Sequence, residues 1–339
     1  MQHAEGRTTL ITSRDVARLA GVSQPTVSRA LRGDQRVSEA TRERVQRAAD
    51  ALNYVPSETG RSLSTRTTKR IGVVVTDLTN PFYPHLIGPL HDELEQHGYR
   101  MMLFTERSET AVASQRLLDR SIDGVVLATA TIGSRLPNDL QQRELPFVFL
   151  NRESGGQPAD AAVVDNELGG RLVARELAGL GHRDIAHIGG PPDTTTGRDR
   201  EMGFRVGLSE AGIGLAEDAV RHGPFDFDTG YRGLTELLAG PTRPTAVFCG
   251  NDVIAIGAFN AARAQGVRIP EDLTLIGFDD IPMAAWEAFG LTTVHYDLGE
   301  LAQEAARLLV RRIDSEGEPE PRRTLFTPEL VLRTTHAAR

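Results

Sequence analysis

The 339-residue chain has the composition of a globular protein, because 40% of its residues are hydrophobic and 25% are charged. This balance excludes disorder over most of the length. The single cysteine, Cys249, excludes an intramolecular disulfide and a cysteine-based zinc cage. The N-terminus lacks the apolar core of a signal peptide, and no apolar run is long enough to span a bilayer. We therefore expect a cytoplasmic protein.

Charge is distributed unevenly along the chain. The formal net charge is −8, but residues 1–69 hold 12 Lys and Arg against 7 Asp and Glu. The rest of the chain holds 26 Lys and Arg against 39 Asp and Glu. A basic segment attached to an acidic one indicates that the basic segment binds a polyanion.

The basic segment begins with a short helical pattern. Thr12 and Asp15 have the spacing of a capping box, with Asp in place of the longer Glu. The apolar side chains that we expect on one face of this helix are Val16, Leu19 and Ala20. Gly21 predicts the end of the helix.

Two further helices follow closely. Ser23 can cap the second helix, with Pro25 in its first turn, and a third helix is predicted from Ser38. A helix, a glycine-containing turn, a second helix and a supporting helix are typical of a DNA-binding helix-turn-helix. The alternative is a generic three-helix bundle, and the basic charge favours DNA binding.

The second helix carries side chains suited to reading bases. Gln24 can pair with adenine and Arg29 with guanine, whereas Pro25 can contact only a methyl group or fill space. Readout at Pro25 is therefore expected to be looser, because proline has no hydrogen-bond donor.

Residues 12–44, TSRDVARLAGVSQPTVSRALRGDQRVSEATRER, resemble the N-terminal signature of the lactose-repressor (LacI/GalR) family of bacterial transcription regulators. The segments DVA, AGVS, TVSR, VS and TR stand in the family's order and spacing. The resemblance implies that Gln24, Pro25 and Arg29 face base edges in the major groove. The other implied DNA contacts in this segment, mostly to the backbone, are Thr12, Ser23, Thr26, Ser28, Asn53 and Tyr54.

A linker, YVPSETGRSL at 54–63, joins this segment to the rest of the chain. A helix this short cannot persist alone, because nucleation costs too much. The resemblance implies that two such hinges fold side by side in the minor groove, with Arg61 preceding a wedging Leu63. Gly60 departs from the family's usual alanine and weakens a hinge helix by roughly 0.5–1 kcal/mol. The alternative is a plain flexible linker.

From Ile71 onward, β-branched runs alternate with helical patterns. The predicted strands are IGVVV, MMLFT, GVVLA, FVFL, 161–164, IAHIG, a strand near Val220, TAVFC and LTLIG. The predicted helices are 82–97, 111–120, one from Asn166, one near 200–211 and one from Asp252. Such alternation predicts an α/β body with open parallel sheets, and its restart near Asp165 predicts two similar lobes.

Polar and aromatic side chains follow the predicted strands, where parallel sheets bind ligands. Some can equally cap the next helix: this applies to Asp165 with Asn166 and to Asn251 with Asp252. The body resembles the periplasmic-sugar-binding-type effector core of the same family at NPF (80–82), DN (165–166), GHRDIAHIGG (181–190), TAVFCGND (245–252) and GFDD (277–280). The effector contacts that the resemblance implies are Phe82, Arg152, Arg200, Phe225, Asn251 and Asp279. Thr194 stands where a nucleobase-binding member carries arginine, which disfavours a purine corepressor.

We thus expect a helix-turn-helix domain at 1–54, a hinge at 55–70 and an effector and dimerisation domain at 71–339. Its first lobe is expected to comprise about 71–164 and 295–326, and its second lobe about 165–294 and 327–339. The tail from Val331 has no leucine heptads, which favours a homodimer over a tetramer.

Enzymatic motifs are missing from the sequence: there is no GxGxxG, P-loop, G-x-S-x-G or H-E-x-x-H. We expect no enzyme activity, no cofactor, no metal and no membrane partner. The predicted function is a dimeric transcriptional regulator, most simply a repressor, that binds a near-palindromic DNA operator under control of a sugar-like or polyol effector. Rival hypotheses are a solute-binding protein and a sugar-metabolising α/β enzyme.

Overall fold

The computed structural model describes residues 11–55, 67–105, 121–156, 158–317 and 319–339. The chain divides into two compact units, a head that ends at Thr68 and a body that starts at Lys69. The hinge residues Arg61 and Leu63, and the helix predicted over 111–120, lie outside the described residues.

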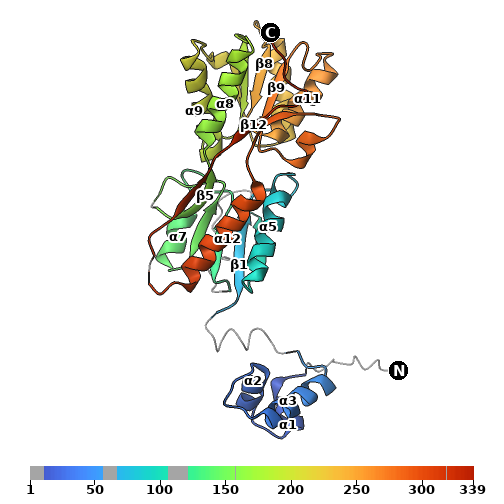
Figure 1. Ribbon diagram of the computed structural model, residues 1–339, viewed down its shortest axis with the longest axis vertical. Helices are drawn as coiled ribbons and strands as arrows, with labels where there is room; N and C mark the ends of the chain where they lie inside the picture. Colours follow the sequence, from blue (N-terminus) through green and yellow to red (C-terminus); the bar gives the residue numbers. More distant parts are fainter. Residues whose placement is uncertain (1–10, 56–66, 106–120, 157, 318) are drawn as a thin grey trace, which may run out of the picture. The chain divides into compact units, whose positions relative to one another are not determined.

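The head contains the helices α1 (Ser13–Ala20), α2 (Gln24–Leu31) and α3 (Glu39–Ala51), labelled in Figure 1. Gly21 ends α1 in the left-handed conformation, at φ +63°, which a residue without Cβ adopts at no steric cost. At the start of α1, the Asp15 carboxylate accepts hydrogen bonds from the Thr12 backbone N–H (3.0 Å) and hydroxyl (2.7 Å). The core of the head consists of Val16, Ala17, Ala20, Val27, Ala30, Val37, Val45, Ala48 and Ala49.

The expectation that Leu19 faces this core is wrong, because its side chain is 57% exposed. The buried face of α1 is formed by Val16, Ala17 and Ala20. At 100° per residue this face is centred between Val16 and Ala17, on the side away from Leu19.

The first sheet of the body defines lobe 1. Its strands, in spatial order, are β11 (Arg323–Phe326), β5 (Asp160–Val164), β4 (Phe147–Leu150), β3 (Gly124–Leu127), β1 (Arg70–Val75) and β2 (Arg100–Thr105), all paired in parallel. The helices α5 (Tyr83–Gln96) and α12 (Leu298–Asp314) pack on one face, and α7 (Leu136–Gln142) packs on the other. Most of these strands are buried on both faces and therefore show continuous apolar runs.

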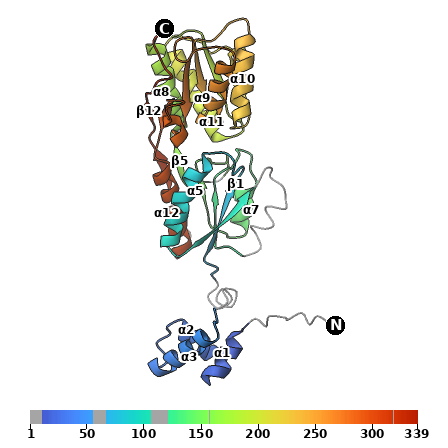
Figure 2. The same ribbon diagram turned by 90° about the vertical axis from the view of Figure 1, so that its right-hand side faces the viewer.

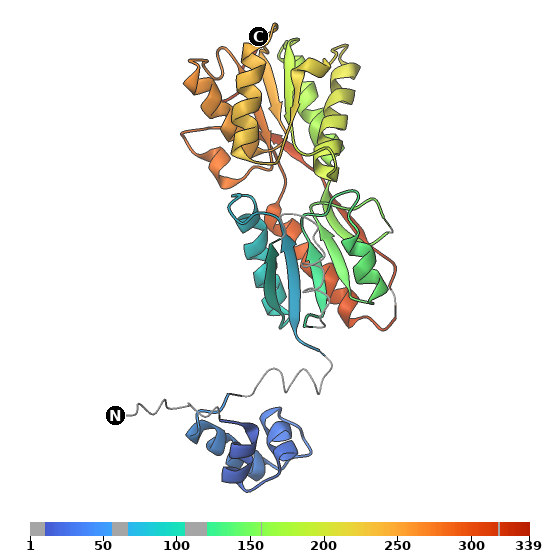
Figure 3. The ribbon, with the colours of Figure 1, turned by 180° about the vertical axis from the view of Figure 1, so that it is seen from behind.

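The second sheet defines lobe 2 and repeats the same strand pattern (Figures 1 and 3). Its strands are β12 (Glu329–Val331), β10 (Thr292–His295), β9 (Thr274–Phe278), β8 (Ala246–Cys249), β6 (Ile185–Gly189) and β7 (Val220–His222), with only β12 antiparallel among the described pairs. The helices α8 (Asn166–Gly179) and α9 (Thr195–Glu210) cover one face, and α10 (Phe227–Ala239) and α11 (Asp252–Ala264) cover the other (Figure 2). Short 3-10 helices, η1 (Glu217–Ala219) and η2 (Pro282–Ala285), complete this lobe.

The chain passes between the lobes in three connections, β5 to α8, β10 to α12 and β11 to β12. The connection from β10 to α12 contains Tyr296 and Asp297, and Asp297 caps α12 through the Glu300 N–H at 2.8 Å. Residues at the carboxyl ends of both sheets are therefore close to the points where the lobes meet.

Close helix packing in lobe 2 depends on glycines. A Cβ at Gly203 of α9 would lie 2.0 Å from the backbone oxygen of Glu167, and one at Gly170 of α8 would lie 2.2 Å from that of Arg200. Only hydrogen atoms allow the two backbones to approach this closely. The approach places Asn166, at the start of α8, within hydrogen-bond distance of Arg200.

Candidate functional site

A cavity of about 880 Å³ lies between the two lobes of the body. Its volume is in the range of small-molecule sites. Lobe 1 contributes Thr76, Asp77, Thr79, Asn80, Pro81, Tyr83, Thr129, Thr131 and Arg152 to the wall. Lobe 2 contributes Pro191, Asp193, Thr194, Pro224, Phe225, Asp226, Phe227, Asp228, Val253, Ile256 and Met283.

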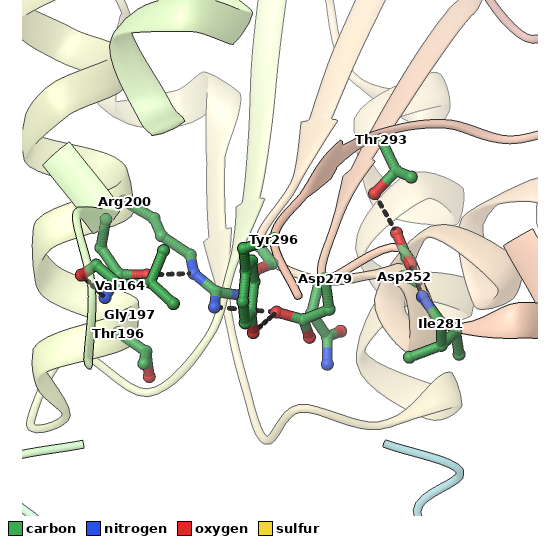
Figure 4. A network of polar contacts seen from close by, with 12 residues as sticks. Val164, Thr196, Gly197, Arg200, Asp252, Asp279, Ile281, Thr293 and Tyr296 are labelled. Carbon is green, nitrogen blue, oxygen red and sulfur yellow. Dashed lines mark hydrogen bonds and ion pairs between the residues drawn. The ribbon is translucent and has the colours of Figure 1, made fainter. Parts of the chain in front are cut away.

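Arg200 of α9 anchors a buried polar network in lobe 2, shown in Figure 4. Its guanidinium donates to the side-chain oxygen of Asn166 (2.9 Å), the backbone oxygen of Gly250 (2.7 Å) and the carboxylate of Asp279 (2.8 Å). The guanidinium carbon also lies 3.7 Å from the ring centroid of Phe278. The partners come from α8 and the ends of β8 and β9, so one side chain fixes three segments.

Asp279 receives a second hydrogen bond, from the Tyr296 hydroxyl at 2.9 Å. Tyr296 lies in the connection from β10 to α12, so this contact joins a lobe-crossing segment to the network. The Asp279 backbone has φ +106°, a conformation rare for a residue with Cβ and typical of functional loops. Burial raises the pKa of Asp279, while Arg200 and the Tyr296 hydroxyl oppose that rise.

Two of the residues predicted as caps do cap helices. Asp165 accepts from the Leu168 N–H (2.9 Å) at the start of α8, and Asn251 accepts from the Ile254 N–H (2.9 Å) at the start of α11. The effector role predicted for Asn251 therefore competes with a local structural one, since its side-chain oxygen is already used.

Asp252 has a different partner set, on the far side of Asp279 from Arg200 in Figure 4. Its carboxylate accepts from the Thr293 hydroxyl (2.5 Å) and the Ile281 N–H (2.9 Å), and the side chain is fully buried. Burial raises the pKa of Asp252 well above its usual value. Asp252 thus holds the loop after β9, which carries Asp279, against β10.

Arg152 and Phe225 meet on the cavity wall. The Arg152 guanidinium carbon lies 5.0 Å from the ring centroid of Phe225, and that of Arg200 lies 6.0 Å from the same centroid. The Phe225 ring is held in place by Gly190, where a Cβ would lie 2.1 Å from it. One aromatic ring is therefore adjacent to two cations from different lobes.

Hydrogen bonds also connect the lobes across the cavity. The Asn80 side-chain amide of lobe 1 donates to the Phe225 backbone oxygen of lobe 2 at 2.8 Å. Two others join the Ile132 N–H to the Asp193 backbone oxygen (2.8 Å) and the Glu153 N–H to the Thr195 hydroxyl (3.2 Å). These contacts hold the lobes in a closed arrangement.

The six predicted effector residues occupy different kinds of position in the structure. Arg152 and Phe225 line the cavity, and Arg200 and Asp279 form the buried network beside it. Phe82 is buried in lobe 1, edge-on to Tyr83 at 5.6 Å between ring centroids, and does not line the cavity. Tyr296 was missed by the sequence analysis, although it is an aromatic residue that directly follows a β-branched strand, as several predicted site residues do.

The predicted DNA-reading residues Gln24, Pro25 and Arg29 are exposed on α2. Gln24 donates from its side-chain nitrogen to the Ser13 hydroxyl at 2.8 Å, which ties the start of α2 to α1. Arg29 is on the outer face, opposite the buried Val27 and Ala30.

The predicted contacts to the DNA backbone other than Thr12 lie on α2, at its start, and after the end of α3. Ser23 and Thr26 share a hydroxyl–hydroxyl hydrogen bond of 2.8 Å, and the Ser28 hydroxyl accepts from Arg32 at 2.9 Å. Asn53 is exposed with φ +49°, and Tyr54 packs against the head's core.

Two further kinds of group were candidates for chemistry, the single cysteine and clusters of metal-ligating side chains. Cys249 is fully buried at the end of β8, and burial raises the pKa of its thiol well above the usual value. Among the described residues, no group of three His, Cys, Asp or Glu side chains could hold a metal ion. Nor is any described helix both long and apolar enough to cross a membrane.

Comparison with known proteins assigns both units. Residues 12–57 match the model of bacterial regulatory proteins of the lacI family, and residues 174–336 match a periplasmic binding protein-like domain. The chain is 35% identical over 328 residues to the ribose operon repressor of Haemophilus influenzae, covering 96% of this chain and 98% of that protein.

Two solved structures are similar over nearly the whole length. One is the transcriptional regulator CelR in complex with cellobiose, at 34% identity and a TM-score of 0.74, covering 96% of this chain and 99% of that one. The other is the lac repressor dimer bound to operator and the anti-inducer ONPF, at 26% identity and a TM-score of 0.85, covering 97% and 99%. The chain therefore belongs to the lacI family of bacterial regulatory proteins, and it is a DNA-binding transcriptional regulator rather than an enzyme.

Proposed function

We propose that the protein is a homodimeric repressor whose two heads bind a near-palindromic operator, and that a polar, sugar-like effector in the body cavity controls this binding. The observation that carries the proposal is the cavity itself, which faces both lobes and adjoins the buried Arg200–Asp279–Tyr296 network. A ligand there can contact both lobes at once and so favour one arrangement of the lobes over another.

The relatives support each part of the proposal. The lac repressor structure is a dimer bound to operator, the CelR structure holds cellobiose, and the relative from Haemophilus influenzae represses a ribose operon. A protein of this kind acts in the cytoplasm, at the nucleoid. We also propose that the helix-turn-helix domain ends at residue 54, that the hinge ends at residue 70, and that the two lobes divide at the three connections between them.

The proposed contacts divide by site. At the operator, Gln24, Pro25 and Arg29 read base edges and Leu63 wedges into the central step after Arg61. In the cavity, Arg152 and Phe225 contact the effector directly. Arg200 and Asp279 respond to it from the adjoining network, because their hydrogen-bonding partners lie in three segments that meet at the cavity's edge.

The coupling works through the lobe connections. Tyr296 bonds to Asp279 and lies two residues before α12, the long helix of lobe 1. A ligand that changes the Asp279 network therefore changes the angle between lobes and, in a dimer, the spacing of the two heads. Couplings of this kind are typically about 1–3 kcal/mol, or roughly 5- to 150-fold in affinity.

The test is a titration of the full-length chain on an operator obtained by selection from random DNA. Candidate effectors are first found by thermal shift, since a ligand that binds the folded state raises the melting temperature. We expect a stabilising ligand to change operator affinity by at least about fivefold. A ligand that stabilises the body strongly and leaves operator affinity unchanged would argue against the proposed control.

A further inference from the structure

Arg152 is a charged side chain on the cavity wall, and no described carboxylate is in ion-pair contact with it. Its Nε atom is shielded from solvent and has no hydrogen-bond partner among the described residues. No ion pair within the described parts of the chain includes its guanidinium, although arginine carries five donors and stays charged at all ordinary pH values. Its neighbour is the face of the Phe225 ring.

The carboxylates near Arg152 are used elsewhere. The next residue, Glu153, pairs with Arg323 at 2.9 Å, and Asp279 pairs with Arg200 at 2.8 Å. On the cavity wall, Asp77 accepts from the Thr79 N–H (2.8 Å) and hydroxyl (2.7 Å), and Asp226 caps α10 through the Thr229 N–H (2.8 Å).

The two remaining acidic residues of the wall, Asp193 and Asp228, are exposed to solvent. They stand at the rim, where water screens them, whereas Arg152 is partly buried and Arg200 is 2% exposed. Around the Phe225 ring, two guanidinium groups are thus balanced by one close carboxylate, that of Asp279.

We infer that the effector carries a negatively charged group, a carboxylate or a phosphate, that pairs with the Arg152 guanidinium. The inference rests on the proposed role of this cavity as the effector site. Phe225 supplies an apolar surface for one face of a sugar ring, and the threonines and rim carboxylates offer partners for hydroxyl groups. The class of ligand is therefore a polyhydroxylated anion: a sugar acid or a sugar phosphate.

A charged ligand fits this environment better than a neutral one. Burial lowers the pKa of Arg152, and the Asp279 and Asp193 carboxylates oppose this lowering only in part, so the charged form lacks full stabilisation. A carboxylate or phosphate accepts two parallel hydrogen bonds from a guanidinium, while a hydroxyl group brings no countercharge. A neutral polyol would close the cavity over an unpaired cation, which is costly.

The experiment is calorimetric titration of the full-length chain with matched pairs of ligands. Aldonates and uronates (ribonate, gluconate, glucuronate, galacturonate) and sugar phosphates (ribose 5-phosphate, glucose 6-phosphate) are each compared with the neutral parent sugar. We expect at least one anion to bind tighter than its parent by tenfold or more, with affinity that falls as salt rises. The two groups of anions distinguish a carboxylate from a phosphate.

Variants test whether Arg152 causes the preference. Arg152→Gln removes the charge and is expected to weaken anion binding by about 10- to 100-fold, while Arg152→Lys retains part of it. The matched control is Arg263→Gln, the same change of charge in the last, exposed turn of α11, roughly 15 Å along that helix from the end near the cavity. It is expected to leave binding unchanged.

Three outcomes would overturn the inference. If the tightest ligand is neutral and still shifts operator affinity, the proposed function stands and the inference that the effector is an anion is wrong. If Arg152→Gln binds the anion as well as the unaltered chain does, the anion lies elsewhere. If no compound in either set binds, the sugar-like effector of the proposed function fails together with its charge.

Discussion

Arg200 and Asp279 form an ion pair with 2.8 Å between nitrogen and oxygen, and their side chains are only 2% and 4% exposed. The pair joins α9 to the loop after β9, and each partner has further hydrogen bonds, to Asn166 and Gly250 on one side and to Tyr296 on the other. A buried pair with this many partners holds α9 and the loop after β9 in one arrangement. Removing one member would leave the other charge buried and unpaired.

Arg200→Ala is therefore expected to lower the free energy of unfolding by about 3–5 kcal/mol, since it leaves the Asp279 carboxylate buried without its cation. Asp279→Leu combined with Arg200→Met should recover much of that loss, because neither charge then remains. Urea denaturation of the single and double variants measures both effects. Single-variant losses under about 1 kcal/mol would mean that the pair is solvated in solution.

His187 predicts a dependence of stability on pH. The ring is fully buried, stacks on Phe248 at 4.9 Å, and bonds through Nδ1 to the Phe248 backbone oxygen at 2.9 Å. Burial lowers the pKa of His187 to about 4 from its usual 6.5. In the unfolded chain this histidine binds a proton below about pH 6.5, but in the folded chain only below about pH 4.

The folded state therefore loses stability as pH falls from about 6.5 to about 4, by about 3 kcal/mol in total from this group. Urea unfolding at pH 7 and pH 5 should show a smaller difference for His187→Gln than for the unaltered chain. His91→Gln is the control, because His91 is exposed on α5, in the other lobe from His187. Equal pH dependence in His187→Gln and the unaltered chain would assign the effect to other groups.

The glycines between α8 and α9 predict a steric effect of one methyl group. Gly203→Ala would place a Cβ 2.0 Å from the Glu167 backbone oxygen and force the helices apart. We expect a loss of about 1–3 kcal/mol in unfolding free energy, together with weaker effector binding, since the shift moves Arg200. Gly179→Ala in α8 has open space around its Cβ and should be neutral or stabilising by up to about 1 kcal/mol. Equal effects in the two variants would show that the helices do not pack as described.

Asn80 tests the closed arrangement of the lobes. Asn80→Ala removes the hydrogen bond to the Phe225 backbone oxygen and should weaken closure by about 1 kcal/mol. For an effector that binds the closed form, affinity falls by about fivefold. Asn260→Ala is the matched control, because the Asn260 side-chain amide donates to the Ile256 backbone oxygen within α11 (2.8 Å) and not across the cavity. An Asn80→Ala variant with unaltered effector affinity would mean that this bond does not favour the closed form.

Local signals carried much of the fold prediction. The end of α1 was predictable because Gly21 adopts a left-handed turn conformation. The strands of lobe 1 and the restart after Asp165 were predictable because strands buried on both faces show continuous β-branched runs. Segments after β9 were not predicted: α12 and the strands β10, β11 and β12 had no assignment. For α12, the Asp297 cap and the buried Leu301, Ala305 and Leu308 at helical spacing were available signals.

The site could be predicted only in part. Arg152 and Phe225 each follow a strand, and both line the cavity. Their position after strands was a usable signal, because strand ends converge at one edge of a parallel sheet. The roles of three other predicted residues depend on backbone angles and on contacts distant in sequence. Asp279 pairs with Arg200, Asn251 caps α11 and Phe82 packs in the core. The bond from Tyr296 to Asp279 is an example, since it needs a connection between lobes that no local pattern specifies.

The central claim is tested most directly by fluorescence anisotropy of the full-length chain on a selected inverted repeat and on a scrambled duplex. We predict a clear preference for the repeat, with affinity that falls steeply as salt rises. Arg29→Ala should lose about 1–3 kcal/mol of that preference, while Arg44→Ala, the same loss of charge on α3, should weaken both duplexes alike. If the chain shows no salt-sensitive preference for any inverted repeat, with or without candidate effectors, the account is contradicted.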